Sequence, residues 1–264
     1  MAKNSIAAVS SRRESLLRFL ALNQNSMLID IASEFGTSEM TIRRDLYALS
    51  EDGLISKGVD NRYSLNCDPA FDPQFFFRYS TNHRKKLAVA EEAAKLISSG
   101  DFVFLDSGTT VLELSKKLMH LDNIKIVTNN LYIPMYISQN PGTIDTELLG
   151  GPVDWPSMST NSDAACKKLE EYRADCVFFS ADGVDPVHGV TIKETQLTHI
   201  KSIMLKQAEK KVLLADSSKL GGCSGRELMS LSDVDVLVTD WDITDVMLQQ
   251  LQGYVGEIIV ATLT

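Results

Sequence analysis

Apolar side chains recur at helical spacing in three short stretches at the start of the chain. These stretches predict helices over 12–24, 27–35 and about 39–51, and Gly36 ends the second of them. A glycine just past a helix commonly ends it, because it adopts the left-handed conformation that other residues avoid. We therefore expect three short helices near the start of the chain.

The third predicted helix has one narrow apolar face. Ile42, Leu46 and Leu49 are spaced four and three residues apart, so they fall on the same side. Thr37 or Ser38 can cap the helix start by accepting hydrogen bonds from backbone N–H groups. The far side and its flanks carry Met40, Thr41, Arg43, Arg44 and Tyr47. We expect this outward face to meet a partner.

A hairpin is predicted after Gly53, from segments 54–57 and 62–65. Two helices joined by a short glycine-containing turn and followed by a hairpin are typical of a winged helix-turn-helix. Arginine forks pair with guanine edges or phosphates, and short hydroxyl side chains at a helix start approach the DNA backbone. The candidate DNA-contacting residues are Ser38, Met40, Thr41, Arg43, Arg44, Tyr47 and Lys57. A winged helix used for protein contact is the alternative.

The rest of the chain alternates strands and helices. Buried strands are predicted at 102–105, 124–127, 144–149, 176–179, 212–215 and 234–238, with helices between them and a last helix and strand at the end. Such alternation implies a mostly parallel α/β sheet with helices on both faces. The predicted class is α/β, with a small winged helix-turn-helix domain ahead of a mostly parallel α/β domain.

The predicted domains are a winged helix-turn-helix over 1–66 and an α/β domain over 81–264. Between them we place a linker over 67–80, which contains two prolines. We expect its aromatic run, Phe75 to Phe77, to pack against a domain rather than to bind a ligand.

Polar and small residues follow five of the predicted strands. In open α/β sheets the ligand crevice lies at the carboxyl ends of the strands, so we expect these loops to form a pocket. The loop from Asp106 to Thr110 opens a helix and can offer backbone N–H groups and hydroxyls to a phosphate. Asp106 and Asp182 can accept hydrogen bonds from sugar hydroxyls, and Lys219 can neutralise a phosphate or carboxylate. The candidate effector-binding residues are Asp106, Ser107, Gly108, Thr109, Thr110, Asn129, Gly150, Gly151, Asp182, Gly183 and Lys219.

Charge separates the two parts of the chain. The protein has 264 residues and a net charge of −9. Residues 1–66 hold eight basic and eight acidic side chains, which leaves 18 of the 26 basic and 27 of the 35 acidic ones for the rest. Phosphates repel an acidic body, so we expect only the neutral first domain to dock on DNA.

Several other classes of protein are disfavoured by the sequence. The four cysteines and four histidines show no metal-ligand spacing, so we expect reduced thiols, no metal and no cofactor. No glycine-rich dinucleotide fingerprint or phosphate-loop motif for nucleoside triphosphates occurs. There is neither a membrane span nor a secretory leader pattern, so we expect a cytoplasmic protein with no membrane partner.

Residues 12–57 resemble the winged helix-turn-helix of DeoR-family bacterial transcription regulators. The run from Ser38 to Leu46, Ser-Glu-Met-Thr-Ile-Arg-Arg-Asp-Leu, matches that family's recognition-helix signature almost letter for letter. The wing departs from the family, since Lys57-Gly58-Val59-Asp60 stands where a Gly-Gly-Ala stretch is usual. An acid at the wing tip weakens a phosphate contact, so we expect the helix to contribute more than the wing.

Residues 80–240 resemble the sensor domain of the same family, which is similar to ribose-5-phosphate isomerase. The matching motifs begin at Asp106, Val127, Leu149, Ala181 and Ala215, in that order. The resemblance implies a phosphorylated sugar or polyol as effector. Two departures concern the choice of sugar: Ser162 replaces a usual glycine, and Thr198-His199 replaces a usual glutamate before Lys201.

The rival class is a sugar-phosphate isomerase-like enzyme with an accessory winged helix. Asp182 and Asp185 could serve as its base by position, and Glu194 only by proximity in the sequence. The segment 189–194 lacks the isomerase's glycine-rich turn. We therefore expect a non-enzymatic regulator, a repressor of a sugar or polyol catabolic operon that binds operator DNA as a homo-oligomer, dimer or tetramer.

Overall fold

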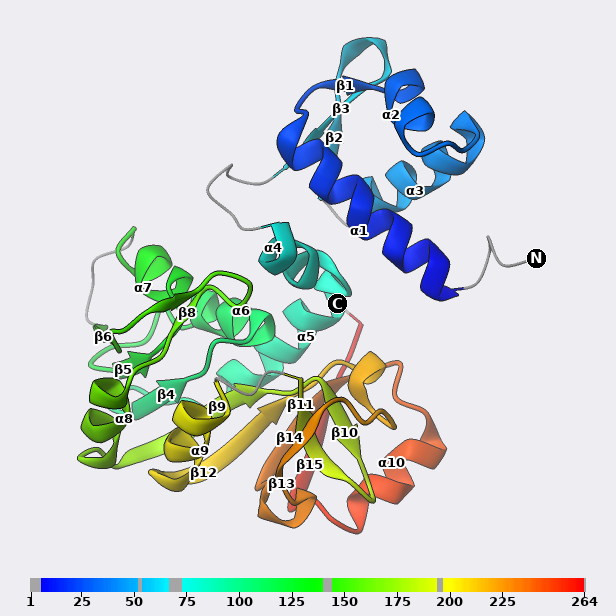
Figure 1. Ribbon diagram of the computed structural model, residues 1–264. Helices are drawn as coiled ribbons and strands as arrows, with labels where there is room; N and C mark the ends of the chain where they lie inside the picture. Colours follow the sequence, from blue (N-terminus) through cyan, green and yellow to red (C-terminus); the bar gives the residue numbers. More distant parts are fainter. Residues whose placement is uncertain (1–5, 52–53, 67–72, 140–143, 194–196, 264) are drawn as a thin grey trace. The chain divides into compact units, whose positions relative to one another are not determined.

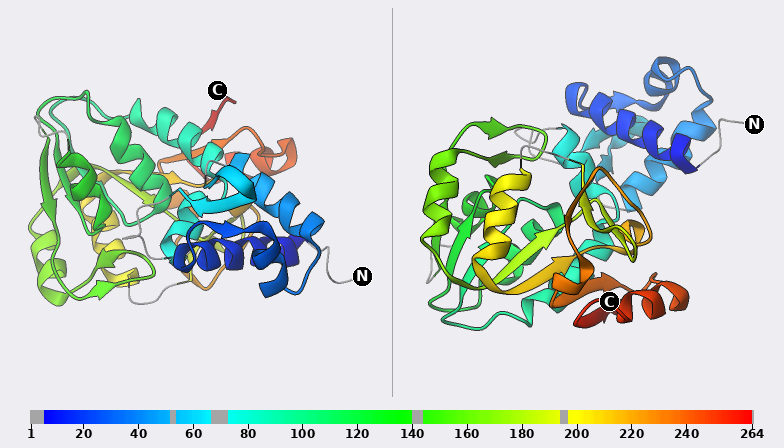
Figure 2. Two further views of the ribbon diagram at one scale, coloured as in Figure 1. Left: turned by 90° about the horizontal axis from the view of Figure 1, so that it is seen from above. Right: turned by 60° about the horizontal axis from the view of Figure 1, so that its bottom comes forward.

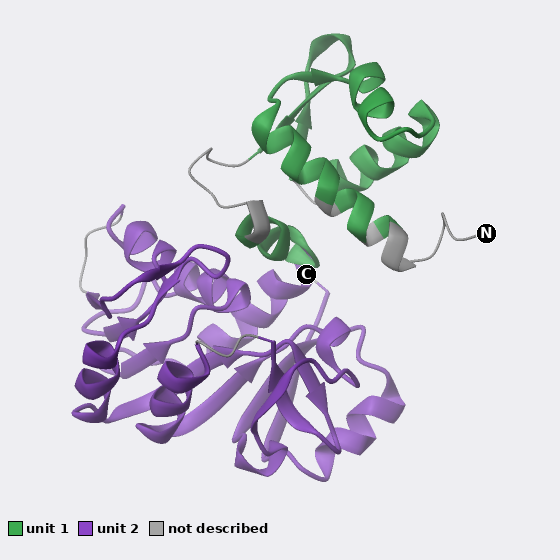
Figure 3. Ribbon diagram, viewed as in Figure 1, with its two compact units in different colours: residues 1–83 green, residues 84–264 purple. Residues whose placement is uncertain are grey.

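The computed structural model describes residues 6–51, 54–66, 73–139, 144–193 and 197–263. The chain divides into two compact units, residues 1–83 and residues 84–264 (Figure 3). We describe each unit separately.

The first unit is a three-helix bundle with a small antiparallel sheet (Figure 1). The helices of the bundle are α1 (Ile6–Leu22), α2 (Leu28–Glu34) and α3 (Glu39–Glu51), and a fourth helix of the unit, after the sheet, is described below. The strands are β1 (Ser26–Met27), β2 (Ile55–Lys57) and β3 (Arg62–Leu65). The sheet order is β1-β3-β2, so the predicted hairpin is present and a third strand joins it. Gly36 ends α2 with a φ of 54°, as its position in the sequence predicts.

One apolar core holds this unit together. It draws Leu16 and Leu20 from α1, Ile31 from α2, and Ile42 and Leu46 from α3, each with no exposed surface. Burying a side chain of this size contributes about 1.5–3 kcal/mol to folding. The apolar stripe of the third predicted helix therefore faces inward, which leaves its opposite face outward.

Within the segment 67–80 that we expect to be a linker, residues 73–80 form a helix, α4 (Pro73–Ser80), which was not predicted. Phe76 is buried in the core of the first unit, and Phe77 and Tyr79 pack against that core. The aromatic run therefore packs against a domain, as expected. The apolar area that these rings bury supplies the reason for the helix, and residues 67–72 lie outside the described part.

The second unit is built on a seven-stranded parallel sheet (Figures 1 and 2). Its order is β15-β14-β12-β9-β4-β5-β6. The strands are β4 (Phe102–Leu105), β5 (Lys125–Thr128), β6 (Asp145–Leu148), β9 (Ala174–Ser180), β12 (Ala208–Leu214), β14 (Val236–Asp240) and β15 (Glu257–Ala261). Each strand predicted for this domain corresponds to one of these. The predicted class, a mostly parallel α/β fold behind a winged helix-turn-helix, is confirmed.

Helices cover both faces of this sheet, as right-handed crossovers require. The helices are α5 (His83–Ala94), α6 (Thr109–Lys117), α7 (Tyr132–Ile137), α8 (Asp163–Glu170), α9 (Thr198–Lys206) and α10 (Asp245–Gln252). Residues from α8, α9 and α10 share one core with Phe104, Val177 and Phe179 of the sheet. The alternate strand residues Val103 and Phe178 are also fully buried, on the other face. The strands are thus buried on both sides, which explains their continuous apolar runs.

Two small antiparallel sheets were not predicted. One joins β10 (Gly183–Asp185), β11 (Gly189–Ile192) and β13 (Arg226–Met229), and the other joins β7 (Val153–Asp154) and β8 (Ser159–Thr160). Their strands have two to four residues, too short for a readable alternation. Both sheets follow directly from loops at the carboxyl edge of the main sheet, so they shape that edge.

Candidate DNA interface and effector site

The outward face of α3 carries the residues predicted to contact DNA. Met40 and Tyr47 are each 67% exposed, and Arg43 and Arg44 are exposed beside them. Within the described residues, neither arginine makes a hydrogen bond or ion pair through its side chain. Two unpaired guanidinium groups on one helix face can donate to guanine edges or phosphates.

The inward face of α3 contains one charged residue, Asp45, which is 2% exposed. Arg12 Nε lies 2.6 Å from Asp45 Oδ2, and Arg13 Nε lies 3.1 Å from Oδ1. Both arginines belong to α1, so the carboxylate holds α3 to α1 inside the bundle. Arginine pairs at 12–13 and 43–44 thus have different roles, one structural and one presented outward.

Ser38 caps the start of α3. Its hydroxyl accepts a hydrogen bond from the Thr41 backbone N–H at 3.3 Å and lies 2.9 Å from Thr41 Oγ1. Of the two caps that the sequence offers, the structure uses this one. Thr41 is half-buried, so it and Ser38 form a hydroxyl pair at the edge of the outward face.

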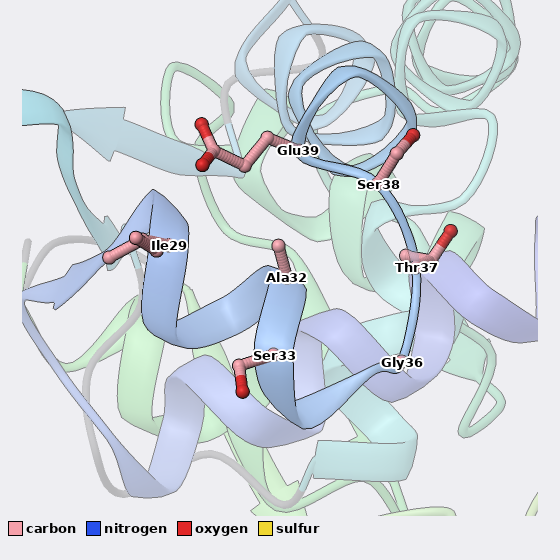
Figure 4. Close-up of a pocket in the computed structure, with 7 residues that line it drawn as sticks. All are labelled: Ile29, Ala32, Ser33, Gly36, Thr37, Ser38 and Glu39. Atoms are coloured by element: carbon pink, nitrogen blue, oxygen red, sulfur yellow. The ribbon is translucent and has the colours of Figure 1, made fainter.

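An open hollow of about 570 Å³ separates α2 from the start of α3 (Figure 4). Its walls come from α2, from the turn, and from the first residue of α3: Ile29, Ala32, Ser33, Gly36, Thr37, Ser38 and Glu39. Because the hollow opens beside the helix start, the Ser38 hydroxyl remains accessible from outside. The Glu39 carboxylate on the same wall disfavours an anion inside the hollow.

The wing is tight and partly acidic. Lys57 at the end of β2 is exposed, as a phosphate contact requires. Asp60 and Asn61 at the tip adopt left-handed φ values of 60° and 54°, which Asp and Asn tolerate better than most residues. Asp60 is also exposed, so the wing presents one cation and one anion.

The predicted effector loops lie along one edge of the sheet. Loops 106–110, 129–130, 150–151, 181–185 and 216–219 follow β4, β5, β6, β9 and β12. These five strands are consecutive in the order β12-β9-β4-β5-β6. Because all are parallel, their carboxyl ends meet at the same edge. The structure therefore brings the predicted loops together.

The loop from Asp106 to Thr110 is fixed on β9. Asp106 is 1% exposed, and its Oδ2 accepts a hydrogen bond from the Ser180 backbone N–H at 3.3 Å. A Cβ on Gly108 would lie 2.0 Å from Ser180 Oγ, so only glycine fits there. Gly108 precedes the first residue of α6, Thr109, which is half-buried. This is the helix start that the sequence assigns to phosphate.

A buried lysine closes this loop from behind. Lys201 Nζ of α9 lies 2.9 Å from Asp106 Oδ2 and donates a hydrogen bond to the Ser180 carbonyl at 3.0 Å. Lys201 is 7% exposed, so its charge is compensated almost entirely by Asp106. Lys201 is a site residue that was not predicted. The one sequence signal for it is that this lysine matches the family's sensor-domain pattern directly after the departure at Thr198-His199.

The neighbouring loops are joined by side-chain hydrogen bonds. Asn130 Nδ2 donates to the Ser107 carbonyl at 3.2 Å, and Asn129 Nδ2 donates to the Thr160 carbonyl at 3.3 Å. Asn129 is 1% exposed, and its Oδ1 has no hydrogen-bond partner among the described residues. A buried acceptor left without a donor costs about 1–3 kcal/mol, so this oxygen favours a ligand that can donate.

Gly150 and Gly151 form a turn that Ser162 secures. Ser162 Oγ donates to the Gly150 carbonyl at 2.8 Å and accepts from the Ala165 backbone N–H at 3.1 Å. Ser162 therefore caps α8, which gives the departure from the usual glycine a structural role. Gly151 has a φ of 146°, and a Cβ there would meet the Asn161 carbonyl oxygen at 2.6 Å.

The remaining predicted residues lie after β9 and β12. Asp182 Oδ2 accepts a hydrogen bond from the Lys193 backbone N–H at 2.9 Å. Gly183 is buried, and a Cβ there would meet the Gly222 carbonyl oxygen at 2.3 Å. Close packing alone therefore requires a glycine at this position. Lys219 is half-buried, and within the described residues its amine makes no ion pair or hydrogen bond. The candidate base Glu194 lies outside the described residues.

Two family descriptions match this chain. The DeoR-like helix-turn-helix domain matches residues 12–60, and the DeoR C terminal sensor domain matches residues 81–241. The chain belongs to the DeoR family. The helix-turn-helix match covers α2, α3 and the first strand of the wing, β2, and the sensor match covers every loop of the strand-end site.

The relatives of this DeoR-family chain are named as regulators. The HTH-type transcriptional regulator GolR of Listeria innocua is 29% identical, over 91% of this chain and 94% of GolR. The lactose phosphotransferase system repressor of Lactococcus lactis is 28% identical, over 92% and 95%. These matches identify a DNA-binding transcriptional regulator and not an enzyme.

A solved structure of ribose 5-phosphate isomerase A from Methanocaldococcus jannaschii is also similar. It is 24% identical and covers 53% of this chain and 55% of the isomerase, with a TM-score of 0.38.

In the part of this DeoR-family chain that is described, no helix combines the length and the apolar character needed to cross a membrane.

Proposed function

We propose that this DeoR-family regulator represses a sugar or polyol catabolic operon and leaves its operator when a phosphorylated sugar binds. The observation that carries the effector half is the set of five polar loops at adjacent strand ends, with the unpaired Asn129 Oδ1 among them. The name of the Lactococcus lactis relative, a repressor, supports the sign of regulation. Such a repressor acts in the compartment that holds the chromosome.

The DNA half of the proposal assigns roles on the first unit. Arg43 and Arg44 read or grip DNA through their unpaired guanidinium groups, with Met40 and Tyr47 beside them on the same face. Ser38, Thr41 and Lys57 contact phosphates at the ends of this surface. If the second unit associates into a dimer or tetramer, two helix-turn-helix units can bind repeated half-sites at once. Simultaneous binding multiplies operator affinity.

The effector half assigns roles at the sheet edge. The phosphate binds at the 106–110 loop, where Gly108 packs closely on Ser180 just before the first residue of α6, and Lys219 supplies the positive charge. Asn129, Asp182 and the Gly150-Gly151 turn contact the hydroxyl groups of the sugar. Asp106, Ser107, Thr110 and Gly183 are buried and shape the pocket.

A sugar phosphate should stabilise the second unit, and the corresponding free sugar should not. At about 100 times its dissociation constant a ligand that binds only the folded state stabilises by roughly 2.7 kcal/mol. Both tryptophans, Trp155 and Trp241, lie in the second unit, so their fluorescence follows its thermal unfolding. Equal stabilisation by free sugars would contradict the phosphate role of the 106–110 loop.

Lys219→Ala should abolish the response to sugar phosphates while operator binding persists. The amine is unpaired among the described residues, so its removal leaves no broken contact behind. A hydrogen bond to a charged group contributes about 1.5–3 kcal/mol, which corresponds to roughly 10- to 150-fold weaker effector binding. Titration calorimetry checks this, with Lys206→Ala at an exposed position of α9 as the matched control. A normal response to sugar phosphates in Lys219→Ala would show that another residue makes the phosphate contact.

A further inference from the structure

Lys85, in the first turn of α5, reaches the carboxyl ends of two strands of the main sheet. Its Nζ lies 2.7 Å from Ser217 Oγ, 2.7 Å from Asp242 Oδ2 and 3.5 Å from Asp240 Oδ1. The Lys85 side chain is 19% exposed and that of Asp240 is fully buried. One amine therefore has three oxygen partners: Asp240 at the end of β14, Asp242 just after it, and Ser217 in the segment that follows β12.

These partners are also bonded to one another. The Ser217 backbone N–H donates to Asp240 Oδ2 at 2.6 Å, and the Asp242 N–H donates to Asp240 Oδ1 at 3.0 Å. Burial lowers the pKa of Lys85, but the hydrogen bond to Asp242 and the charges of Asp240, Asp242 and Asp216 outweigh it and raise the pKa. The amine therefore stays charged, and the cluster is a fully paired unit.

The cluster joins two parts of the chain with different predicted tasks. Ser217 belongs to the short helix Ser217–Lys219, which carries the proposed phosphate contact. Lys85 is the second residue of the unit that begins at Arg84, directly after the chain leaves the helix-turn-helix unit. The cluster therefore connects the 216–219 loop to the first residues of the sensor domain.

We propose that Lys85 is a positioning residue for the effector response, which transmits occupancy of the 216–219 loop to the start of α5 and so to the helix-turn-helix unit. This inference rests on the proposed function. It requires no contact between Lys85 and the effector. An effector shifts operator affinity only if the operator-bound and the operator-free arrangement of the protein bind the effector with different affinities. The contacts of Lys85 supply the path from the 216–219 loop to the start of the sensor domain.

The test compares full-length wild type with Lys85→Met, which keeps the length of the side chain and removes its charge. Operator affinity is measured with and without each of a panel of sugar phosphates, and sugar-phosphate affinity is measured by calorimetry. Wild type should lose about 5- to 150-fold in operator affinity when the effector saturates it. Lys85→Met should bind operator and effector separately as wild type does, but the effector should no longer change its operator affinity.

Two further variants serve as controls. Lys95→Met removes an exposed lysine just after α5 whose partner among the described residues is Glu92, three positions earlier, and it should respond as wild type. Lys85→Arg keeps the charge and should retain most of the response. If Lys85→Met fails to fold, Asp242→Asn takes its place, since Asp242 is 55% exposed and its loss removes the closest charge partner.

Two outcomes would overturn the inference: an unchanged response in Lys85→Met or Asp242→Asn, or a loss of effector binding itself, which would make Lys85 a ligand contact. A wild type that ignores every sugar phosphate contradicts the proposed function instead. Hydrogen exchange then decides on Lys85 without any effector. Asp242→Asn should speed exchange in peptides covering 216–222 and also 84–94, and unchanged exchange in 84–94 overturns the link.

Discussion

Arg44→Ala is expected to reduce operator binding sharply while both units stay folded. Arg44 is exposed on the outward face of α3, and among the described residues its side chain has no partner whose loss would disturb the fold. An arginine that pairs with a guanine contributes about 1–3 kcal/mol, or roughly 5- to 150-fold per head. When two helix-turn-helix units bind one operator, the fold-change in operator affinity is the square of this value. An electrophoretic mobility shift assay at fixed salt should therefore detect it readily.

The matched control is Arg226→Ala, which removes an exposed arginine of β13 in the sensor domain. Both variants change the net charge by the same amount, so a general electrostatic effect would weaken both equally. A selective loss in Arg44→Ala locates the effect on α3. If Arg44→Ala binds its operator like wild type with an intact fold, α3 is not the recognition helix.

Asp45→Asn is expected to destabilise the helix-turn-helix unit although it leaves the shape of the side chain unchanged. The substitution removes the charge that Arg12 and Arg13 face inside the bundle. Breaking a buried pair costs about 3–5 kcal/mol, and because the arginine side chains are 19% and 34% exposed we expect about 2–3 kcal/mol. Small domains are stable by only about 5–15 kcal/mol, so operator binding should fail at moderately raised temperature.

Hydrogen exchange over residues 6–51 measures this loss directly. Tryptophan fluorescence reports only the sensor domain, because Trp155 and Trp241 both lie there, and its unfolding should not change. Asp30→Asn, at an exposed position of α2, provides the control for a lost carboxylate without a buried pair. Equal exchange in Asp45→Asn and Asp30→Asn would show that the buried pair contributes nothing.

Helix α3 was predictable because its signals are local. Its apolar stripe, its hydroxyl cap and the glycine before it all lie within residues 36–49, and they agree. The buried ion pair of α3 with α1 also had a signal in the sequence. Asp45 falls between Ile42 and Leu49 on the apolar stripe, and a carboxylate in such a place needs a buried cationic partner.

Helix α4 was not predicted, although a local signal for it also existed. Two prolines and three adjacent phenylalanines indicated a linker, yet a proline is also common as the first residue of a helix, the place that Pro73 takes in α4. The pair of Lys201 and Asp106 could not be predicted in this way. The two residues are 95 positions apart, and only the order β9-β4 in the sheet brings α9 behind the 106–110 loop.

The division of α3 into two faces affects how related regulators can come to bind different operator sequences. Ile42, Asp45, Leu46 and Leu49 are committed to the bundle, whereas the outward set of Met40, Arg43, Arg44 and Tyr47 supports no other part of the described structure. A gene can therefore exchange the outward set codon by codon without rebuilding the domain. If the outward set reads the operator as proposed, a duplicated copy can acquire a new operator while its sensor domain stays unchanged.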